Sequence, residues 1–377
     1  MKQSVRYISG ILFLIVYVVL IYVVNRGNAS FQAVSAGNYV SGVVVSVIED
    51  NTEPDYEYSE GLRLGSQKLK IKMTGGKHKG EIHEVTNSLS ALYNVYAKEG
   101  TKVMLLVTEQ TNGSYNVSVY SYDRTGILGA FVLVFFIAMC VIGGKKGIKA
   151  VAGLVFTVLS IMCILVPLAA RGYDVTGIAI VFVIIVTIVV FMIIDGIKFK
   201  TAAAMVSTIG GVLFAGLTSI IVEKYGHLSG YNMEAAENLM LISSQNVIRI
   251  RGLLTACILI AALGAVMDVA MSISSAVCEV YEADKRQTFI KLFKSGMNVG
   301  RDAMGTMANT LILAFAGSSL NLLLLVFSYG IPFYRFLNTD QIAIEILQAV
   351  GGSLGIISAV PIAAAVVSGL LCWKKTT

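Results

Sequence analysis

Charged residues are scarce in this chain, and their scarcity decides the class of protein. Only 14% of the 377 residues are charged, whereas 56% are hydrophobic, and the mean hydropathy is +0.76. A soluble globular domain carries about 25% charged residues. The composition therefore excludes an ordinary soluble protein and predicts an integral membrane protein.

Residues for chemical sites are also few. The chain has five cysteines and three histidines, and every cysteine lies in or beside an apolar run. The sequence therefore predicts neither a disulfide framework nor a zinc site. No HExxH, Walker A or GxGxxG motif occurs. We expect a protein without enzyme activity, bound metal or cofactor.

One apparent catalytic motif has a simpler interpretation. Residues 351–355 match the G-x-S-x-G pattern of a hydrolase nucleophile. That nucleophile needs a strand-to-helix turn with His and Asp partners, whereas this serine lies in a long apolar run. Gly351 and Gly355 instead have the four-residue spacing of a GxxxG helix-packing face.

The net charge of +6 does not indicate nucleic-acid binding. Lys and Arg sit mainly at the ends of apolar runs instead of along one face, which is typical of topology signals. Lys2 and Arg6 precede an apolar run over residues 7–24. This run exceeds the 7 to 15 residues usual for the core of a signal peptide, although Ala29 and Ala33 leave cleavage open. We favour a retained anchor, residues 1–24, with a cytoplasmic N-terminus.

Residues 25–124 have the composition of a soluble domain. Leu69, Ile71 and Met73 alternate with lysines, as in a half-buried strand. A helix is expected around residues 88–96, and the glycines between the apolar runs predict turns. The pattern favours a small β-barrel resembling an OB-fold, with five strands at residues 39–48, 67–73, 81–85, 101–107 and 114–122.

The remainder, residues 125–377, reads as a domain of seven membrane helices. With the anchor, the fold class is a mostly α polytopic membrane protein with eight transmembrane helices. Basic residues on alternate turns place both termini in the cytoplasm and the β domain outside it. The seven apolar runs are residues 126–143, 150–170, 175–194, 201–222, 253–278, 303–329 and 346–371.

Two of these runs carry polar stripes at helical spacing, which puts each stripe on one helix face. A carboxylate on a membrane helix costs at least about 2.5 kcal/mol, so it usually faces a bundle interior or water. We therefore expect a polar path between the sixth and seventh spans. Glycines in the stripes predict helix packing. The stripes are Gly264, Asp268, Ser272 and Ser275, and then Asp302, Gly305, Thr306 and Asn309.

Each polar residue also has a structural interpretation. Asp268 is either a proton or cation relay or a buried residue bonded to a neighbouring helix. Asp302 directly follows Arg301, which favours a local salt bridge or a helix-start role. Asn309 either coordinates a substrate or ties two helices together.

The sequence resembles the YibE/F family of bacterial multi-spanning membrane proteins. The resemblance extends from about residue 126 to the C-terminus, and the β domain with its anchor is similar to longer members. It implies a bacterial plasma-membrane location and names no substrate. Two blocks carry it: Gly264, Ala265, Val266, Met267, Asp268, Ser272, Ser274 and Ser275, then Gly300, Arg301, Asp302, Met304, Gly305, Thr306, Asn309, Thr310 and Leu311.

Two functions fit these patterns. The first is a permease-like protein in the lipid bilayer that moves a small solute or a cation past the two acid-bearing helices. The second is a non-transporting envelope protein whose β domain binds an exported partner, with the spans as a platform. Neither involves nucleic acid.

The first function predicts an effect of Asp268→Asn. If the acid-bearing helices line the path, removing this carboxylate lowers uptake or ion flux in proteoliposomes. Flux of the variant is compared with that of the unsubstituted protein at equal protein content. An unchanged flux would count against this path.

Overall fold

The computed structural model describes residues 17–26, 38–55, 61–109, 114–233, 236, 239–240 and 249–376. The chain forms two compact units, one of residues 1–28 with 139–377 and one of residues 29–138. Most of the expected anchor, and the expected cleavage region at Ala29 and Ala33, lie outside the described residues.

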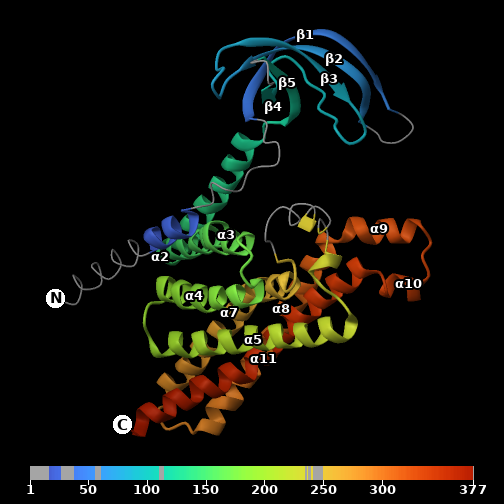
Figure 1. The fold of residues 1–377 in the computed structure, drawn as a ribbon. Coiled ribbons are helices and arrows are strands. Elements are labelled where there is room, and N and C mark those ends of the chain that lie inside the picture. Colours follow the sequence, from blue (N-terminus) through green and yellow to red (C-terminus); the bar gives the residue numbers. More distant parts are fainter. Residues whose placement is uncertain are drawn as a thin grey trace, which may run out of the picture. The chain divides into compact units, whose positions relative to one another are not determined.

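Long apolar helices make up most of the chain (Figure 1). Among the described residues, five helical stretches are long and apolar enough to cross a membrane, or six if α8 and α9 form one bent span. The chain is therefore a multi-span membrane protein. The helices are α2 (Thr125–Ser160), η2 (Ile161–Leu165), α3 (Val166–Ala170), α4 (Val175–Ile194), α5 (Phe199–Gly226), η3 (Gly230–Asn232), α7 (Leu253–Ala283), α8 (Phe289–Ser318), α9 (Leu320–Ser328), α10 (Phe333–Leu337) and α11 (Asp340–Thr376).

The expected count of eight spans exceeds this number for two reasons. The anchor lies mostly outside the described residues, and the two runs at residues 126–143 and 150–170 form one helical stretch, Thr125–Ala170. Gly144 interrupts that stretch with non-helical angles, φ 52° and ψ −132°. The kink brings Gly147 against the carbonyl oxygen of Met139, where a side chain would not fit.

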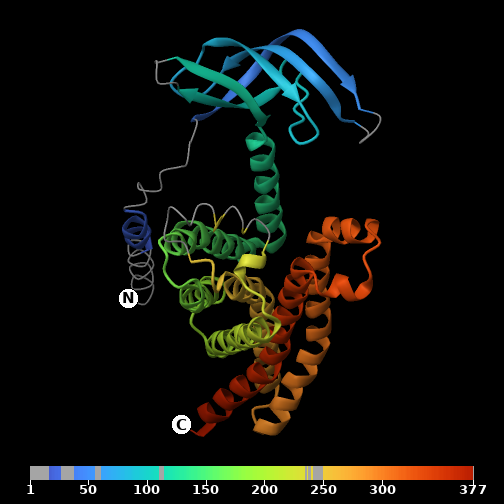
Figure 2. The same ribbon diagram turned by 45° about the vertical axis from the view of Figure 1, so that its right-hand side comes forward.

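Small residues let the helices of the larger unit approach closely. α11 packs on α5, α7 and α8, and α8 runs beside it (Figure 2). Between α5 and α11, a Cβ at Gly211 would lie 2.8 Å from Ala359 Cβ and 2.9 Å from the Gly355 carbonyl oxygen. Gly296 and Gly300 of α8 likewise face α11. Such contacts stabilise membrane helices because lipid supplies no hydrophobic force between them.

The smaller unit contains a five-stranded antiparallel sheet in the order β3-β2-β1-β4-β5, curved into a half-barrel (Figure 2). The expected strand alternation in β2 is confirmed, because Leu69, Ile71 and Met73 are at most 1% exposed. In the described part of this unit, no ladder joins the edge strands β3 and β5. The strands are β1 (Asn38–Pro54), β2 (Arg63–Met73), β3 (Ile82–Leu89), β4 (Lys102–Glu109) and β5 (Tyr115–Tyr122).

The expected helix at residues 88–96 is wrong. β3 continues to Leu89, and residues 90–98 form no helix or strand. The buried Gln67 side chain donates to the Ala97 carbonyl (3.1 Å) and accepts from the Ala97 N–H (3.0 Å). Asn87 donates to the Val95 carbonyl at 2.7 Å. Side chains of the sheet thus take the backbone groups that a helix would use.

These bonds predict the effect of Asn87→Ala. The substitution leaves the Val95 carbonyl without its donor, so the free energy of unfolding of the sheet should fall by about 1–3 kcal/mol. The urea dependence of oxidation at the buried Met73, read by mass spectrometry, measures it. Thr86→Ala, at the exposed neighbouring position, is the control and should stay within about 0.5 kcal/mol. Equal losses in both variants would contradict the assignment.

Candidate functional site

The stripe of α7 lies at the edge of the larger unit. Gly264, Asp268 and Ser272 are exposed, and nothing lies within 4 Å of a Cβ built at Gly264. Ser275 is half-buried, and the Lys200 ammonium group donates to its hydroxyl at 3.4 Å. Of the four residues, only Ser275 has a polar side-chain partner in the described part of the chain.

The stripe of α8 is exposed over its whole length. Asp302, Gly305, Thr306 and Asn309 all lie on the side away from the buried Gly300. The Thr306 hydroxyl donates to the Ala303 carbonyl at 2.9 Å, within its own helix. Asp302 lies in the interior of α8, because this helix already begins at Phe289, so the helix-start role is wrong. Among the described residues, no ion pair joins it to Arg301.

The two acidic residues do not meet between α7 and α8. These helices contact each other where Gly296 and Gly300 of α8 face Val277 and Ile273 of α7. At 100° per residue, Asp268 points about 140° away from Ile273, and Asp302 points about 160° away from Gly300. The expected polar path between the sixth and seventh spans, with the two stripes facing each other, is therefore wrong. A role for these residues in transport stays a prediction.

The other two predicted packing glycines lie inside the bundle. Gly355 faces Ala215 of α5, at 2.9 Å from a built Cβ, and Gly351 faces Ile258 of α7 at 3.5 Å. Gly305, by contrast, has open space around it, like Gly264. Close packing thus occurs where a glycine meets another apolar helix.

A different carboxylate is held by two helices. Glu223, in the last turn of α5, accepts hydrogen bonds from the hydroxyls of Ser219 at 3.0 Å and of Thr255 at 2.6 Å. Thr255 lies in the first turn of α7. It borders a cavity of about 940 Å³ with both charge signs in its wall. The cavity is lined by Asp174, Thr176, Ile220, Glu223, Lys224, His227, Leu228, Ser229, Arg249, Arg251, Gly252 and Thr255.

A second cavity, of about 770 Å³, lies at the other ends of α5 and α7. Lys200 near the start of α5 pairs with Asp195 at 3.0 Å and reaches Ser275 of α7. The same two helices therefore carry a polar cavity at each end. The lining residues are Lys198, Phe199, Lys200, Ser275, Cys278, Glu279, Tyr281, Glu282, Lys285 and Leu371.

Buried hydroxyls lie between the two cavities. Thr201, Thr208 and Ser219 of α5 are 0% exposed, and their spacing of seven and eleven residues puts them on the face that carries Glu223. Ser274 of α7 is also 0% exposed. Within the described residues, the hydroxyls of Thr201, Thr208 and Ser274 have no hydrogen-bond partner. The sequence analysis did not predict this stripe, because it considered only polar stripes that contain a charged residue. The spacing of seven and eleven residues would have been enough to predict one helix face.

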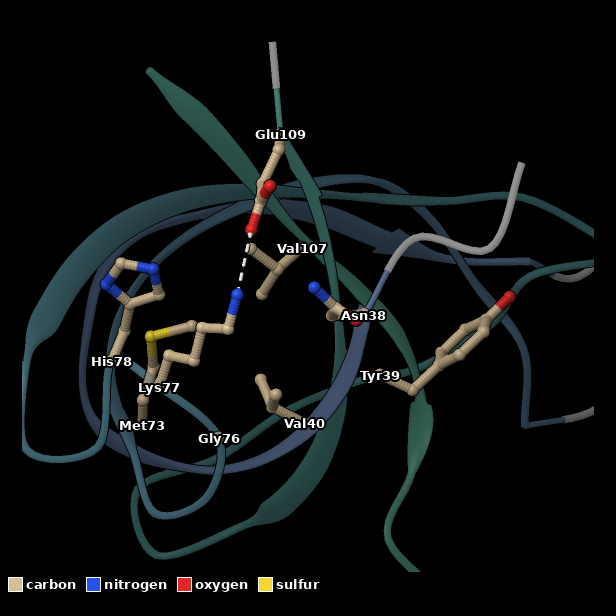
Figure 3. A pocket seen from close by; sticks show the side chains of 9 residues that line it. All are labelled: Asn38, Tyr39, Val40, Met73, Gly76, Lys77, His78, Val107 and Glu109. Atoms are coloured by element: carbon tan, nitrogen blue, oxygen red, sulfur yellow. Dashed lines mark ion pairs between the residues drawn. The ribbon is translucent and has the colours of Figure 1, made fainter. Parts of the chain in front are cut away.

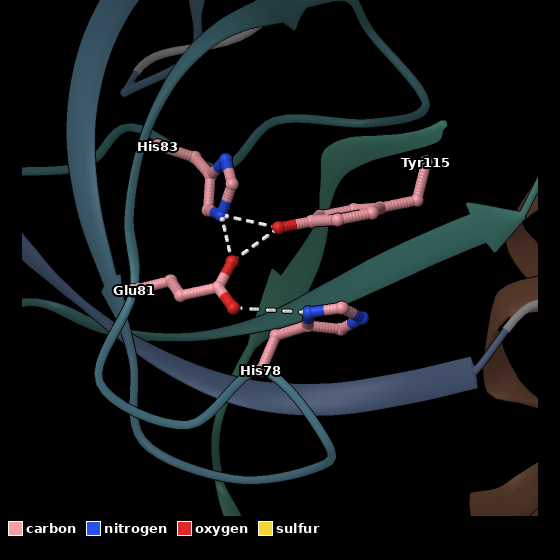
Figure 4. Close-up of polar contacts among 4 residues, drawn as sticks. All are labelled: His78, Glu81, His83 and Tyr115. Atoms are coloured by element: carbon pink, nitrogen blue, oxygen red, sulfur yellow. Dashed lines mark hydrogen bonds and ion pairs between the residues drawn. The ribbon is translucent and has the colours of Figure 1, made fainter. Parts of the chain in front are cut away.

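The β domain has its own polar cluster, in which Glu81 lies between His78, His83 and Tyr115 (Figure 4). Its carboxylate is 3.1 Å from His78 Nδ1 and 3.2 Å from His83 Nε2, and the Tyr115 hydroxyl donates to it. Tyr115 lies on β5 and His83 on β3. The cluster therefore joins by side chains the two strands that lack a ladder.

Hydrogen bonds set the ionisation of this cluster. The bond from Tyr115, and next that from His78, lowers the pKa of Glu81, while the same carboxylate raises the pKa of Tyr115. No group of three His, Cys, Asp or Glu side chains in the described chain is placed to hold a metal ion. We assign the cluster to closing the half-barrel.

A small pocket lies nearby, between the start of β1 and the turn after β2 (Figure 3). Lys77 and Glu109 face each other across it at 3.9 Å. Its volume is about 200 Å³, below the roughly 300 Å³ at which ligand pockets begin. We assign no ligand to it.

Comparison with known proteins supports the division seen in the structure. A family model described as YibE/F-like protein matches residues 131–373, and one described as YibE/F family N-terminal domain matches residues 38–122. No curated protein and no solved structure matches the chain. The second match covers the strands of the half-barrel, and the first covers the helices that carry both cavities.

The lowered pKa of Glu81 predicts a pH dependence. Its stabilising contribution is present above about pH 4.3, the ordinary glutamate value, and is lost as pH falls through the lower value of the folded protein. Glu81→Gln should therefore destabilise the β domain at pH 7, and the difference should shrink by pH 3.5. Urea-dependent oxidation of Met73 measures both. Glu84→Gln, whose carboxylate is 3.8 Å from Lys68 on the surface, is the control. A difference that does not change with pH would contradict this role.

Proposed function

The chain belongs to the YibE/F-like family of multi-span membrane proteins, and from this premise we propose that it is permease-like, with a polar path between α5 and α7. The observation that carries the proposal is the pair of cavities at the two ends of these helices, with buried hydroxyls between them. Hydroxyls that pack between membrane helices usually bond within a helix or across the interface, whereas those of Thr201, Thr208 and Ser274 have no such partner among the described residues.

The spacing of the cavities suits a path across a bilayer. Lys200 and Glu223 are 23 residues apart on one helix, which corresponds to about 35 Å at 1.5 Å per residue. The hydrocarbon core is about 30 Å thick. The two cavities would therefore open toward opposite sides of the membrane.

Apolar contacts close the middle of this path. A Cβ built at Gly216 of α5 would lie 2.7 Å from Leu259 of α7, and one built at Gly211 would lie 2.9 Å from Val266. Passage therefore requires α5 and α7 to move relative to each other, as in carriers that expose a site to each side in turn. Under this proposal, the contacts between α5 and α7 would be those of a closed state.

The chemistry of the path favours a proton or a small cation. Glu223 is the acidic residue on the α5 face. Between the cavities the polar groups on this face are hydroxyls, which can both donate and accept hydrogen bonds, and the cavity walls carry acidic and basic residues. A carboxylate along a polar path is typical of ion and proton pathways. This path replaces the one expected between the sixth and seventh spans.

The proposed topology has eight spans, cytoplasmic termini and an extracytoplasmic β domain of OB-like form. Lys149 donates to the Ile194 carbonyl, and Lys200 pairs with Asp195, so several basic residues gather at one end of the helices. The positive-inside rule assigns that end to the cytoplasm. The kink at Gly144 would separate the second span from the third.

A second candidate function rests on the edges of the half-barrel. β3 and β5 have no ladder between them among the described residues, and an unpaired strand edge can accept a strand from another chain. This feature favours an exported partner at the β domain. In that case the helices would serve as a platform, and no variant would change a flux.

Glu223→Gln tests the proposed path. Glu223 is the carboxylate proposed to bind the moving ion, so losing its charge should slow proton or cation flux in proteoliposomes by about tenfold or more, a factor that corresponds to about 1.4 kcal/mol. Asp302→Asn is the matched control, because Asp302 faces away from α7. Slowing by Asp302→Asn alone would restore the path at α8 and exclude ours. Absence of flux in the unsubstituted protein would favour the second function.

A further inference from the structure

A break between α8 and α9 borders another polar pocket. α8 ends at Ser318 and α9 begins at Leu320, with a bend of 58° between them (Figure 1). Ser319 lies between the two helices. A broken membrane helix frees backbone groups and turns a helix end toward the interior, an arrangement that ion sites in membrane proteins use.

The pocket has a volume of about 530 Å³ and joins the break to the first turns of α11. At the edge of the pocket, the Asn232 side-chain amide donates to the Asp340 carboxylate at 2.7 Å and so joins η3 to the start of α11. Most polar side chains in its wall are uncharged and carry an oxygen atom. The polar lining residues considered are Ser318, Ser319, Asn321, Gln341, Glu345 and Gln348.

Two buried oxygens in this pocket lack partners. Ser319 is 8% exposed, and within the described chain its hydroxyl has no hydrogen-bond partner. The same is true of Oε2 of Glu345, which is buried on α11. Buried polar atoms are nearly always bonded to protein, water or ligand. Both residues line the same cavity, so a water molecule or an ion held between these side chains would satisfy both oxygens.

The charge of the lining identifies the class of this species. Glu345 is the one charged residue among the described lining residues, and no Lys, Arg or His lines the pocket. The carbonyl end of α8 contributes partial negative charge, whereas the amino ends of α9 and α11 at the same pocket contribute partial positive charge. Glu345 therefore supplies the net negative charge. Oxygen ligands suit hard cations, and a single carboxylate matches a single positive charge.

We propose that this pocket binds a monovalent cation, with Glu345 as its charged ligand and Ser319 as a neutral one. The volume exceeds that of a bare ion, so an alkali-metal ion would keep part of its water shell. A small organic ammonium ion offers the same charge. The site stands apart from the path between α5 and α7 and does not depend on it.

The test uses the full-length protein in detergent. Its thermal unfolding midpoint is measured while sodium, potassium or ethylammonium chloride replaces N-methylglucamine chloride at constant ionic strength. A ligand that binds only the folded state raises the midpoint with concentration. We expect at least one cation to do so.

Glu345→Gln should weaken this cation effect by about tenfold or more, and Ser319→Ala should weaken it less. Glu49→Gln, at an exposed position of β1 in the smaller unit, is the control and should respond as the unsubstituted protein does. If Glu345→Gln does not fold, Ser319→Ala decides the question. A response to ethylammonium alone identifies an organic ligand. No midpoint shift with any cation, or equal shifts in all variants, would overturn the site.

Discussion

Close backbone approach between α5 and α11 is the contact on which the helical unit depends. Gly211 of α5 faces the Gly355 carbonyl and Ala359 of α11, and Val266 of α7 fits against the same glycine. Lipid supplies no hydrophobic force between helices, so close packing holds them together, and the bond from Thr255 to Glu223 also joins α7 to α5. The two helices run antiparallel, since Gly216 lies against Leu259 whereas Lys200, at the start of α5, reaches Ser275 toward the end of α7. A polar cavity lies at each end of this pair.

The hydroxyls of this unit fall into two groups. Ser207 donates to the Ala203 carbonyl at 2.7 Å, and Ser353 donates to the Ala349 carbonyl at 2.7 Å. Such bonds within one helix satisfy a buried hydroxyl. Thr208 and Ser274 make none in the described chain, although they are buried as deeply. The first group explains how hydroxyls are tolerated in the bundle, and the second needs partners that the described side chains do not supply.

The sequence predicted the strands and helices better than the contacts between them. The five strands and the apolar helices follow from alternation and length, which are local properties. The helix at residues 88–96 failed because Gln67 and Asn87, distant in sequence, bind its backbone. The Glu345 pocket was also missed. This pocket forms where the break at Ser319 lies against α11. The two segments are apart in sequence, so neither one predicts the pocket by itself.

The misplaced acidic stripes show what periodicity leaves undetermined. Spacing correctly groups Asp268 with Gly264 and Ser272 on one face of α7, but it does not say where the face points. The opposite face carries Leu259, Val266 and Ile273, all at most 1% exposed, and these larger side chains fill the space between helices. Packing therefore fixes the rotation of α7, and the small polar residues take the remaining side. Within a membrane, the carboxylate of Asp268 still requires water or protein beside it. The role of Asp268 therefore depends on what contacts this exposed face of α7.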